Sequence, residues 1–113
     1  MPRDPRTYLW DARRAAEQVG TFVAGRSRAD YAADVMLRSA VERQFEIVGE
    51  ALNKLSRADP DLAASIADLP RIVAFRNLLI HGYANIDDEL VWDAATNRVG
   101  PLVARLTELL EDQ

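Results

Sequence analysis

The sequence predicts an all-α protein, an up-and-down four-to-five-helix bundle formed by one domain over residues 1–113. Apolar residues recur at three- and four-residue steps along most of the chain, which is the period of an amphipathic helix. The connections between these periodic segments are short, and short connections favour antiparallel neighbours. No segment alternates as a half-buried strand would. A chain of 113 residues, 49% of them hydrophobic, is long enough to bury one core.

The first predicted helix begins at Asp4-Pro5, where an acidic N-cap precedes a proline at the first helical position. Its apolar stripe runs from Leu9 to Val23, and Gly25 ends the helix. A polar turn leads into the second predicted helix, which is about 25 residues long, from roughly Ala29 to Ser56.

The second predicted helix carries an acidic line, Glu42, Glu46 and Glu50, at four-residue spacing. One interpretation is a solvated face supported by neighbouring arginines, which we favour for Glu42 and Glu46. Glu50 follows Gly49, and a glycine inside a helix costs roughly 1 kcal/mol relative to alanine. Close packing of another helix, or of a second subunit, would explain Gly49.

Two further helix starts follow the second predicted helix. Asp59-Pro60 opens a short helix that ends near Ala67, and Pro70 opens the next helix. Gly82 lies where a glycine is expected to end that helix.

The last helix begins after the loop Tyr83 to Ile86, with the acid-rich turn 87–89 favourable to the helix dipole. Its apolar register continues from Val91 to Leu109. Because the register passes through Gly100-Pro101, we expect a kink near Pro101 or two abutting helices.

Composition excludes several classes of protein. No apolar run approaches the ~18 residues of a membrane span, and no apolar segment follows the first arginines as in a signal peptide. The absence of cysteine excludes disulfides and thiolate metal sites, so we expect a cytoplasmic protein. The net charge of −4 argues against a protein that coats nucleic acid. Lys54 is the only lysine, so arginine could still form local phosphate sites.

The candidate site is the stretch RNLLIHGY, from Arg76 to Tyr83, which holds the only histidine of the chain. Arginine offers a permanent charge in a planar fork, and histidine can exchange a proton near neutral pH. Together they can act on a phosphate ester. Arg76 and His81 are about 140° apart around a helix, but a long arginine and a last-turn histidine can reach one concavity.

Each of these residues also has a purely structural interpretation. His81 could be partly buried and bonded to a carbonyl at the helix end. Arg76 could pair with a glutamate of the second helix, and Tyr83 could simply pack at a helix end. No P-loop or metal-ligand cluster occurs in the sequence, so we expect no cofactor.

The pattern R-x4-H-x-Y, formed by Arg76, His81 and Tyr83, resembles the motif of the HEPN superfamily. The HepT-like branch, which contains ribonuclease toxins of the HepT–MntA toxin–antitoxin type, is the most similar. Further support comes from the segment EIVGEAL at residues 46–52 and from Val91-Trp92 in the last helix. The resemblance covers nearly the whole chain.

This resemblance implies a metal-independent endoribonuclease that acts as a homodimer. His81 would take the acid/base role, Arg76 the phosphate role, and Asn77 would orient a neighbour or the RNA substrate. Glu50 is a possible supporting residue. The products would carry a 2′,3′-cyclic phosphate and a 5′-hydroxyl. One chain has one histidine, so catalysis by two histidines would need the second subunit of a two-fold dimer.

The resemblance also implies a partner, an MntA-like nucleotidyltransferase antitoxin in a type VII-like system. Such an antitoxin would attach AMP to Tyr83, and the added phosphate would occupy the charge meant for RNA. Two alternatives stay open: a non-catalytic helical module that serves a nucleotidyltransferase as partner or substrate-binding subunit, and a structural helical domain in which the motif is coincidental.

Overall fold

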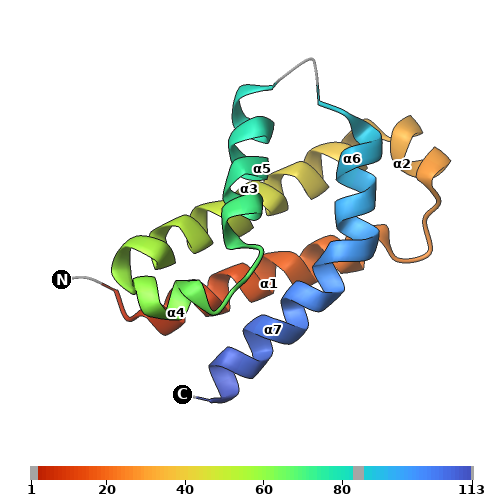
Figure 1. Ribbon diagram of the computed structural model, residues 1–113. Helices are drawn as coiled ribbons and strands as arrows, with labels where there is room; N and C mark the ends of the chain where they lie inside the picture. The colour runs from red at the N-terminus through yellow and green to blue at the C-terminus, as the bar shows by residue number, and fades with distance from the viewer. Residues whose placement is uncertain (1–2, 83–85, 113) are drawn as a thin grey trace.

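The computed structural model describes residues 3–82 and 86–112, and within these ranges all regular structure is helical. Helices α1 (Pro5–Val23) and α3 (Val35–Ala58) run in opposite directions and pack together. Helix α7 (Val99–Glu111) packs on α1, and α5 (Leu69–His81) crosses over α3 at a steep angle (Figure 1). The predicted all-α class and bundle are therefore confirmed.

Helix α1 starts and ends as the sequence predicts. Asp4 caps it by accepting a hydrogen bond of 2.9 Å from the backbone N–H of Arg6, and Pro5 occupies the first helical position. After the helix ends at Val23, Gly25 adopts a φ of +74°, a left-handed conformation that glycine takes without a steric penalty. The chain then turns toward α2.

The predicted helix from Ala29 to Ser56 is wrong as one element, because it is divided at Asp34. Helix α2 (Arg28–Ala33) begins with a capping box between Ser27 and Asp30. Asp34 is extended, with φ −114° and ψ 101°. Its side chain accepts a hydrogen bond of 3.1 Å from the N–H of Leu37, which starts α3. Asp34 is thus a helix cap, where the apolar stripe had indicated continuous helix.

The short helix α4 (Pro60–Ala64) ends three residues before the predicted Ala67. Helix α5 follows, and Gly82 forms its C-cap as predicted. Gly82 has an ordinary φ of −86°, and its N–H donates to the carbonyl of Leu78 at 2.7 Å. A Cβ on Gly82 would lie 2.5 Å from that carbonyl oxygen. Close approach, and not a left-handed backbone, is the reason for glycine here.

The last helical region contains α6 (Asp88–Asp93), a π-helical turn (Ala94–Arg98) and α7. In the π turn the N–H of Val99 donates to the carbonyl of Ala94, five residues earlier. The chain changes direction between α6 and α7 (Figure 1). The interruption expected near Pro101 is therefore present, and it is a π turn that ends three residues before the proline.

The core lies where α1, α3 and α7 meet and continues under α6. Its largest fully buried side chains are Tyr31, Leu9, Leu52, Leu55 and Leu106. The Tyr31 ring lies 5.6 Å from that of Trp92 and joins α2 to α6, while the hydroxyl of Tyr31 is buried and finds no partner in residues 3–82 and 86–112. Of the helices in the described ranges, none has the length and apolar character to cross a membrane.

Gly49 brings α3 and α5 into close contact. A Cβ on Gly49 would lie 2.2 Å from the Cβ and 2.7 Å from the Cγ of Arg76. These atoms belong to the rigid base of the arginine side chain, so they cannot swing aside. The expected close packing of another helix at Gly49 is confirmed, and the other helix is the one that carries the candidate site.

We predict that Gly49→Ala destabilises the protein by about 1–3 kcal/mol, because the added methyl group overpacks the α3–α5 contact. Urea unfolding followed by circular dichroism measures this. Gly20→Ala is the matched control, since a Cβ on Gly20 meets nothing within 4 Å and should stabilise α1 by about 0.4–1 kcal/mol. Equal stabilisation by both substitutions would contradict the prediction.

Candidate functional site

Helix α5 carries positive charge in an acidic protein. Between Leu69 and His81 it has two arginines, one histidine and no acidic residue, although the whole chain has a net charge of −4. Of its residues only Leu69 and Leu79 are buried, so most of the helix surface is open to solvent. An anionic ligand would therefore find a locally favourable potential along α5.

Arg76 is half-buried, and its guanidinium is directed sideways along α5. The Nη1 atom donates a hydrogen bond of 2.9 Å to the side-chain oxygen of Asn77, and the Nε atom is buried with no partner among the described residues. The alternative of an ion pair with a helix-two glutamate is wrong. Glu46 pairs with Arg43, and Glu50 pairs with Lys54, each at 3.4 Å.

Asn77 and His81 lie four residues apart on α5, so their side chains share one face. Both are exposed, and the interpretation of His81 as a partly buried structural histidine is wrong. His81 is in the last turn, where a cation is favoured by the helix dipole. Asn77 thus contacts the guanidinium of Arg76 and shares a helix face with His81, and these three residues form the candidate site.

The two remaining candidate residues are not part of this arrangement. Tyr83 lies outside the described residues, so its role stays a prediction. Glu50 is paired with Lys54 and, together with Arg3 and Tyr8, lines a shallow depression on the α1 side of α3. Among the described residues no contact favours the supporting role considered for Glu50, which stays a prediction.

A pocket beneath the end of α5 contains a carboxyl group that the sequence had not distinguished. Glu42 and Glu46 line it with Leu79, Ile80 and Ile86. Burial raises the pKa of Glu42, and the nearby carboxylate of Asp88 raises the pKa further, while Arg38 lowers it. Glu42 is thus half-buried, so only part of its side chain lies on the solvated face predicted for it, and Arg38 is the neighbouring arginine that favours its charge. For Glu46, the predicted pairing with a neighbouring arginine is confirmed by Arg43.

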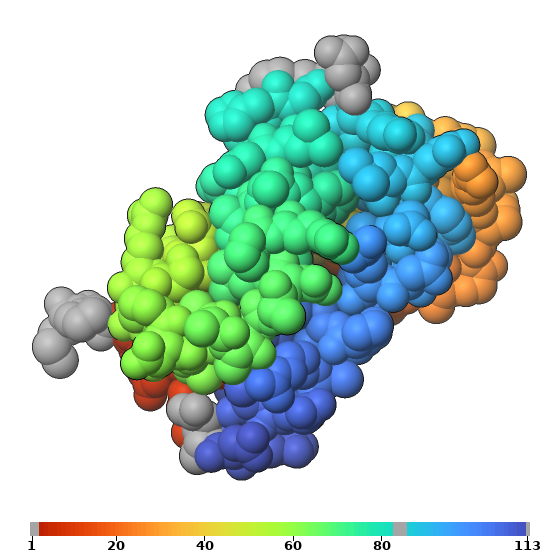
Figure 2. Space-filling model, viewed as in Figure 1, coloured from red at the N-terminus to blue at the C-terminus, as the bar shows by residue number. Residues whose placement is uncertain are grey.

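An apolar groove lies on the opposite flank of α5, between this helix and the α6–α7 region. Its volume is about 350 Å³, and the surface is hollowed there between α5 and the blue C-terminal region (Figure 2). The lining residues are mostly apolar with two acidic and two basic residues among them: Phe45, Val48, Asp68, Arg71, Ile72, Phe75, Leu90, Asp93, Ala94, Arg98, Val99 and Leu102. Because α3, α5, α6, the π turn and α7 all contribute to the groove, no single motif in the sequence could have revealed it.

Comparison with known proteins is consistent with the resemblance seen in the sequence. The family model described as "HepT-like: Ribonuclease HepT-like" matches residues 12–109. A protein of Methanocaldococcus jannaschii named "Putative RNase" is 30% identical over 110 residues, which is 96% of this chain and 97% of the relative. A protein of Thermococcus cleftensis named "Probable ribonuclease HepT" is 26% identical over 96% of this chain and 98% of its own length. No solved structure matches the chain.

We predict that Glu42→Gln stabilises the protein at neutral pH. The folded state holds the pKa of Glu42 above its ordinary value of 4.5, so ionisation of this carboxyl disfavours folding as the pH rises. Below about pH 4.5 the substitution should change the urea midpoint little, and above it the variant should become the more stable protein. Glu17→Gln, on the exposed face of α1, is the control. A gain in the free energy of unfolding that is the same at pH 4 and pH 7 would contradict the prediction.

Proposed function

The chain belongs to the HepT-like ribonuclease family, and from that premise we propose that it is a metal-independent endoribonuclease acting through Arg76, Asn77 and His81. One observation carries the proposal. The guanidinium of Arg76 has no carboxylate within ion-pairing distance in the described part of the chain, and it donates to Asn77 beside the exposed face of His81. An arginine left without an acid is available to a phosphate.

RNA supplies its own nucleophile, so the protein has to supply a proton acceptor for the 2′-hydroxyl, a positive charge for the phosphate and a proton donor for the 5′-oxygen. His81 takes the proton of the 2′-hydroxyl as the 2′-oxygen attacks phosphorus. Arg76 stabilises the charge that develops on the phosphate oxygens, and Asn77 holds the guanidinium in place. The bond to the 5′-oxygen breaks and that oxygen gains a proton, which leaves a 2′,3′-cyclic phosphate and a 5′-hydroxyl. No step requires a metal or a cofactor.

The 5′-oxygen also needs a proton donor, and the chain has one histidine. We propose a two-fold homodimer in which His81 and Arg76 of both subunits face a shared RNA-binding cleft between the subunits. The exposure of Asn77, Leu78 and His81 on the outer side of α5 supports this arrangement, because these residues are open to a second subunit.

We further propose that the protein is the toxin of a type VII-like toxin–antitoxin pair. Its partner would be an MntA-like nucleotidyltransferase that transfers AMP to the hydroxyl of Tyr83. The adenylyl phosphate would add negative charge two residues after His81 and compete with RNA for Arg76. ATP and magnesium would belong to the partner's reaction.

We predict that His81→Ala and Arg76→Ala each lower the rate of RNA cleavage by about 10²–10⁴-fold, the range for loss of an acid–base group or a transition-state charge. Cleavage of a labelled single-stranded RNA, with analysis of the product ends, measures this. The wild type should cut equally well in EDTA.

Arg57→Ala, which removes an exposed arginine at the end of α3, is the charge-matched control and should retain activity. Each variant should keep the circular dichroism spectrum of the wild type. If folded His81→Ala cleaves RNA as fast as the wild type, the ribonuclease mechanism is wrong. If neither the wild type nor any variant cleaves RNA, the better interpretation is that this protein is a non-catalytic partner of a nucleotidyltransferase.

We predict that incubation with the cognate nucleotidyltransferase, ATP and magnesium increases the mass of this protein by one adenylyl group. Intact-mass analysis should show the increase for the wild type, and fragmentation should place it on Tyr83. Tyr83→Phe should gain no mass and should stay active in the presence of the partner. Modification of Tyr8 instead, which is partly exposed whereas Tyr31 is buried, would contradict the assignment.

A further inference from the structure

We infer that the groove between α5 and the α6–α7 region binds one nucleotide of single-stranded RNA, with its base in the apolar floor and its phosphate between Arg71 and Arg98. This inference rests on the proposed ribonuclease function and extends it to substrate recognition. It assigns the groove a ligand that neither the family match nor the motif assigns.

The floor of the groove has the size and chemistry of a base-binding site. Its volume of about 350 Å³ lies within the range of ~300–1,000 Å³ for small-molecule sites. Phe45 and Phe75 form an edge-to-face pair with ring centres 5.2 Å apart, and Leu90 closes one side while 46% exposed. Aromatic and aliphatic surfaces of this kind accept the faces of any base, because stacking requires no specific hydrogen bonds.

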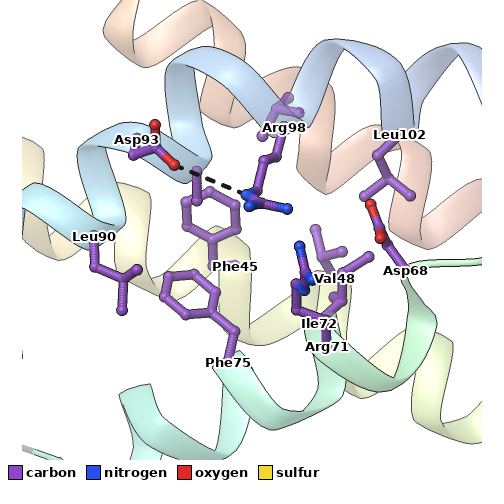
Figure 3. Close-up of a pocket in the computed structure, with 12 residues that line it drawn as sticks. Phe45, Val48, Asp68, Arg71, Ile72, Phe75, Leu90, Asp93, Arg98 and Leu102 are labelled. Carbon is purple, nitrogen blue, oxygen red and sulfur yellow. Dashed lines mark ion pairs between the residues drawn. The ribbon is translucent and has the colours of Figure 1, made fainter.

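The rim supplies positive charge at the mouth of the groove. The side chains of Arg71 from α5 and Arg98 from the π turn point toward one another from opposite sides of the groove (Figure 3). The Nε atom of Arg98 is 3.8 Å from Asp93, and Arg71 has no carboxylate within ion-pairing distance among the residues described. Arg71 is therefore open to a phosphate, and Arg98, which pairs with Asp93 through Nε, has Nη groups that could donate to the same phosphate.

The two acidic groups of the rim limit what can bind. Asp68 lies beside the start of α5 and Asp93 at the end of α6, on either side of the arginine pair. A long run of phosphates along the groove would meet these carboxylates. A single phosphate held between the arginines would not, so the charge pattern fits one nucleotide better than a duplex.

The groove is connected to the candidate site across the surface of α5. Phe75 and His81 are six residues apart, which places them about 120° apart around the helix. The surface between them is formed by Ala74 and Leu78, both exposed and neither charged. A helix is ~10 Å across, so a nucleotide in the groove and a scissile phosphate at His81 can belong to adjacent parts of one strand.

A second copy of the chain fits the groove less well. In the dimer proposed above, the outer face of α5 that carries His81 is turned to the partner. The groove lies on a different flank, so a subunit in it would leave the two His81 side chains far apart. The positions of Arg71 and Arg98 therefore favour RNA as the ligand of the groove.

Binding of a fluorescein-labelled single-stranded RNA of about twelve nucleotides tests the inference, with His81→Ala as the background so that the RNA stays intact. Leu90→Glu puts a carboxylate at the groove mouth, and Met36→Glu puts one on a distant residue that is 80% exposed. We expect Leu90→Glu to weaken binding about five- to tenfold by fluorescence anisotropy, and Met36→Glu less than about twofold.

A second pair of variants tests the phosphate contact. Arg71→Ala should reduce the slope of log Kd against log salt by about 0.7, the value for one contact to a single strand, and Arg57→Ala should leave it unchanged. In the wild-type background, Leu90→Glu should raise the KM for RNA cleavage more than it lowers kcat.

The outcomes separate this inference from the proposed function. If the wild type cleaves RNA through His81 but the two groove variants behave as their controls do, the groove inference is wrong and the ribonuclease proposal stands. If Leu90→Glu changes the mass measured by light scattering and leaves KM unchanged, the groove is a contact between subunits and the inference is also wrong. If the wild type neither binds nor cleaves RNA, both proposals are wrong.

Discussion

The close contact between Gly49 and Arg76 determines where the candidate site lies. Because Gly49 has no side chain, α5 can approach α3 until the Cβ of Arg76 occupies the place that another residue's Cβ would take. The arginine side chain then cannot continue toward α3, and its guanidinium extends sideways to Asn77. The position of one charged group thus depends on the absence of one methyl group on the neighbouring helix.

The same packing explains how an acidic protein can present a positively charged helix. Two glutamates of α3 are engaged locally, since Glu46 pairs with Arg43 and Glu50 with Lys54. Glu42 is half-buried near Asp88 at the start of α6, and its burial together with the Asp88 carboxylate raises its pKa. Net charge describes the whole chain, whereas the potential that a ligand meets depends on which charges are already paired and on which surface they lie.

Much of the fold follows from local sequence signals, and the errors arise where tertiary contacts decide. Caps such as Asp4 and Asp59 lie beside prolines and could be recognised, but an isolated aspartate such as Asp34 fits either a cap or a helix interior. The helix is divided at Asp34, close to Tyr31, which is buried against Trp92 more than sixty positions later in the sequence. The motif indicated Arg76 and His81, while the bond to Asn77, the burial of Glu42 and the groove depend on the positions of neighbouring helices.

The π turn between α6 and α7 takes up one extra residue without changing which side of the C-terminal helix is buried. A π turn contains one residue more than an α-helical turn, and each of its residues turns the chain by less than the ~100° of an α-helix. Loss of one residue from Ala94 to Arg98 could therefore restore a regular helix while Leu106 and Leu109 stay on the buried side. In sequences related to this one, a single-residue gap in this segment is thus compatible with the same packing of the last helix on α1.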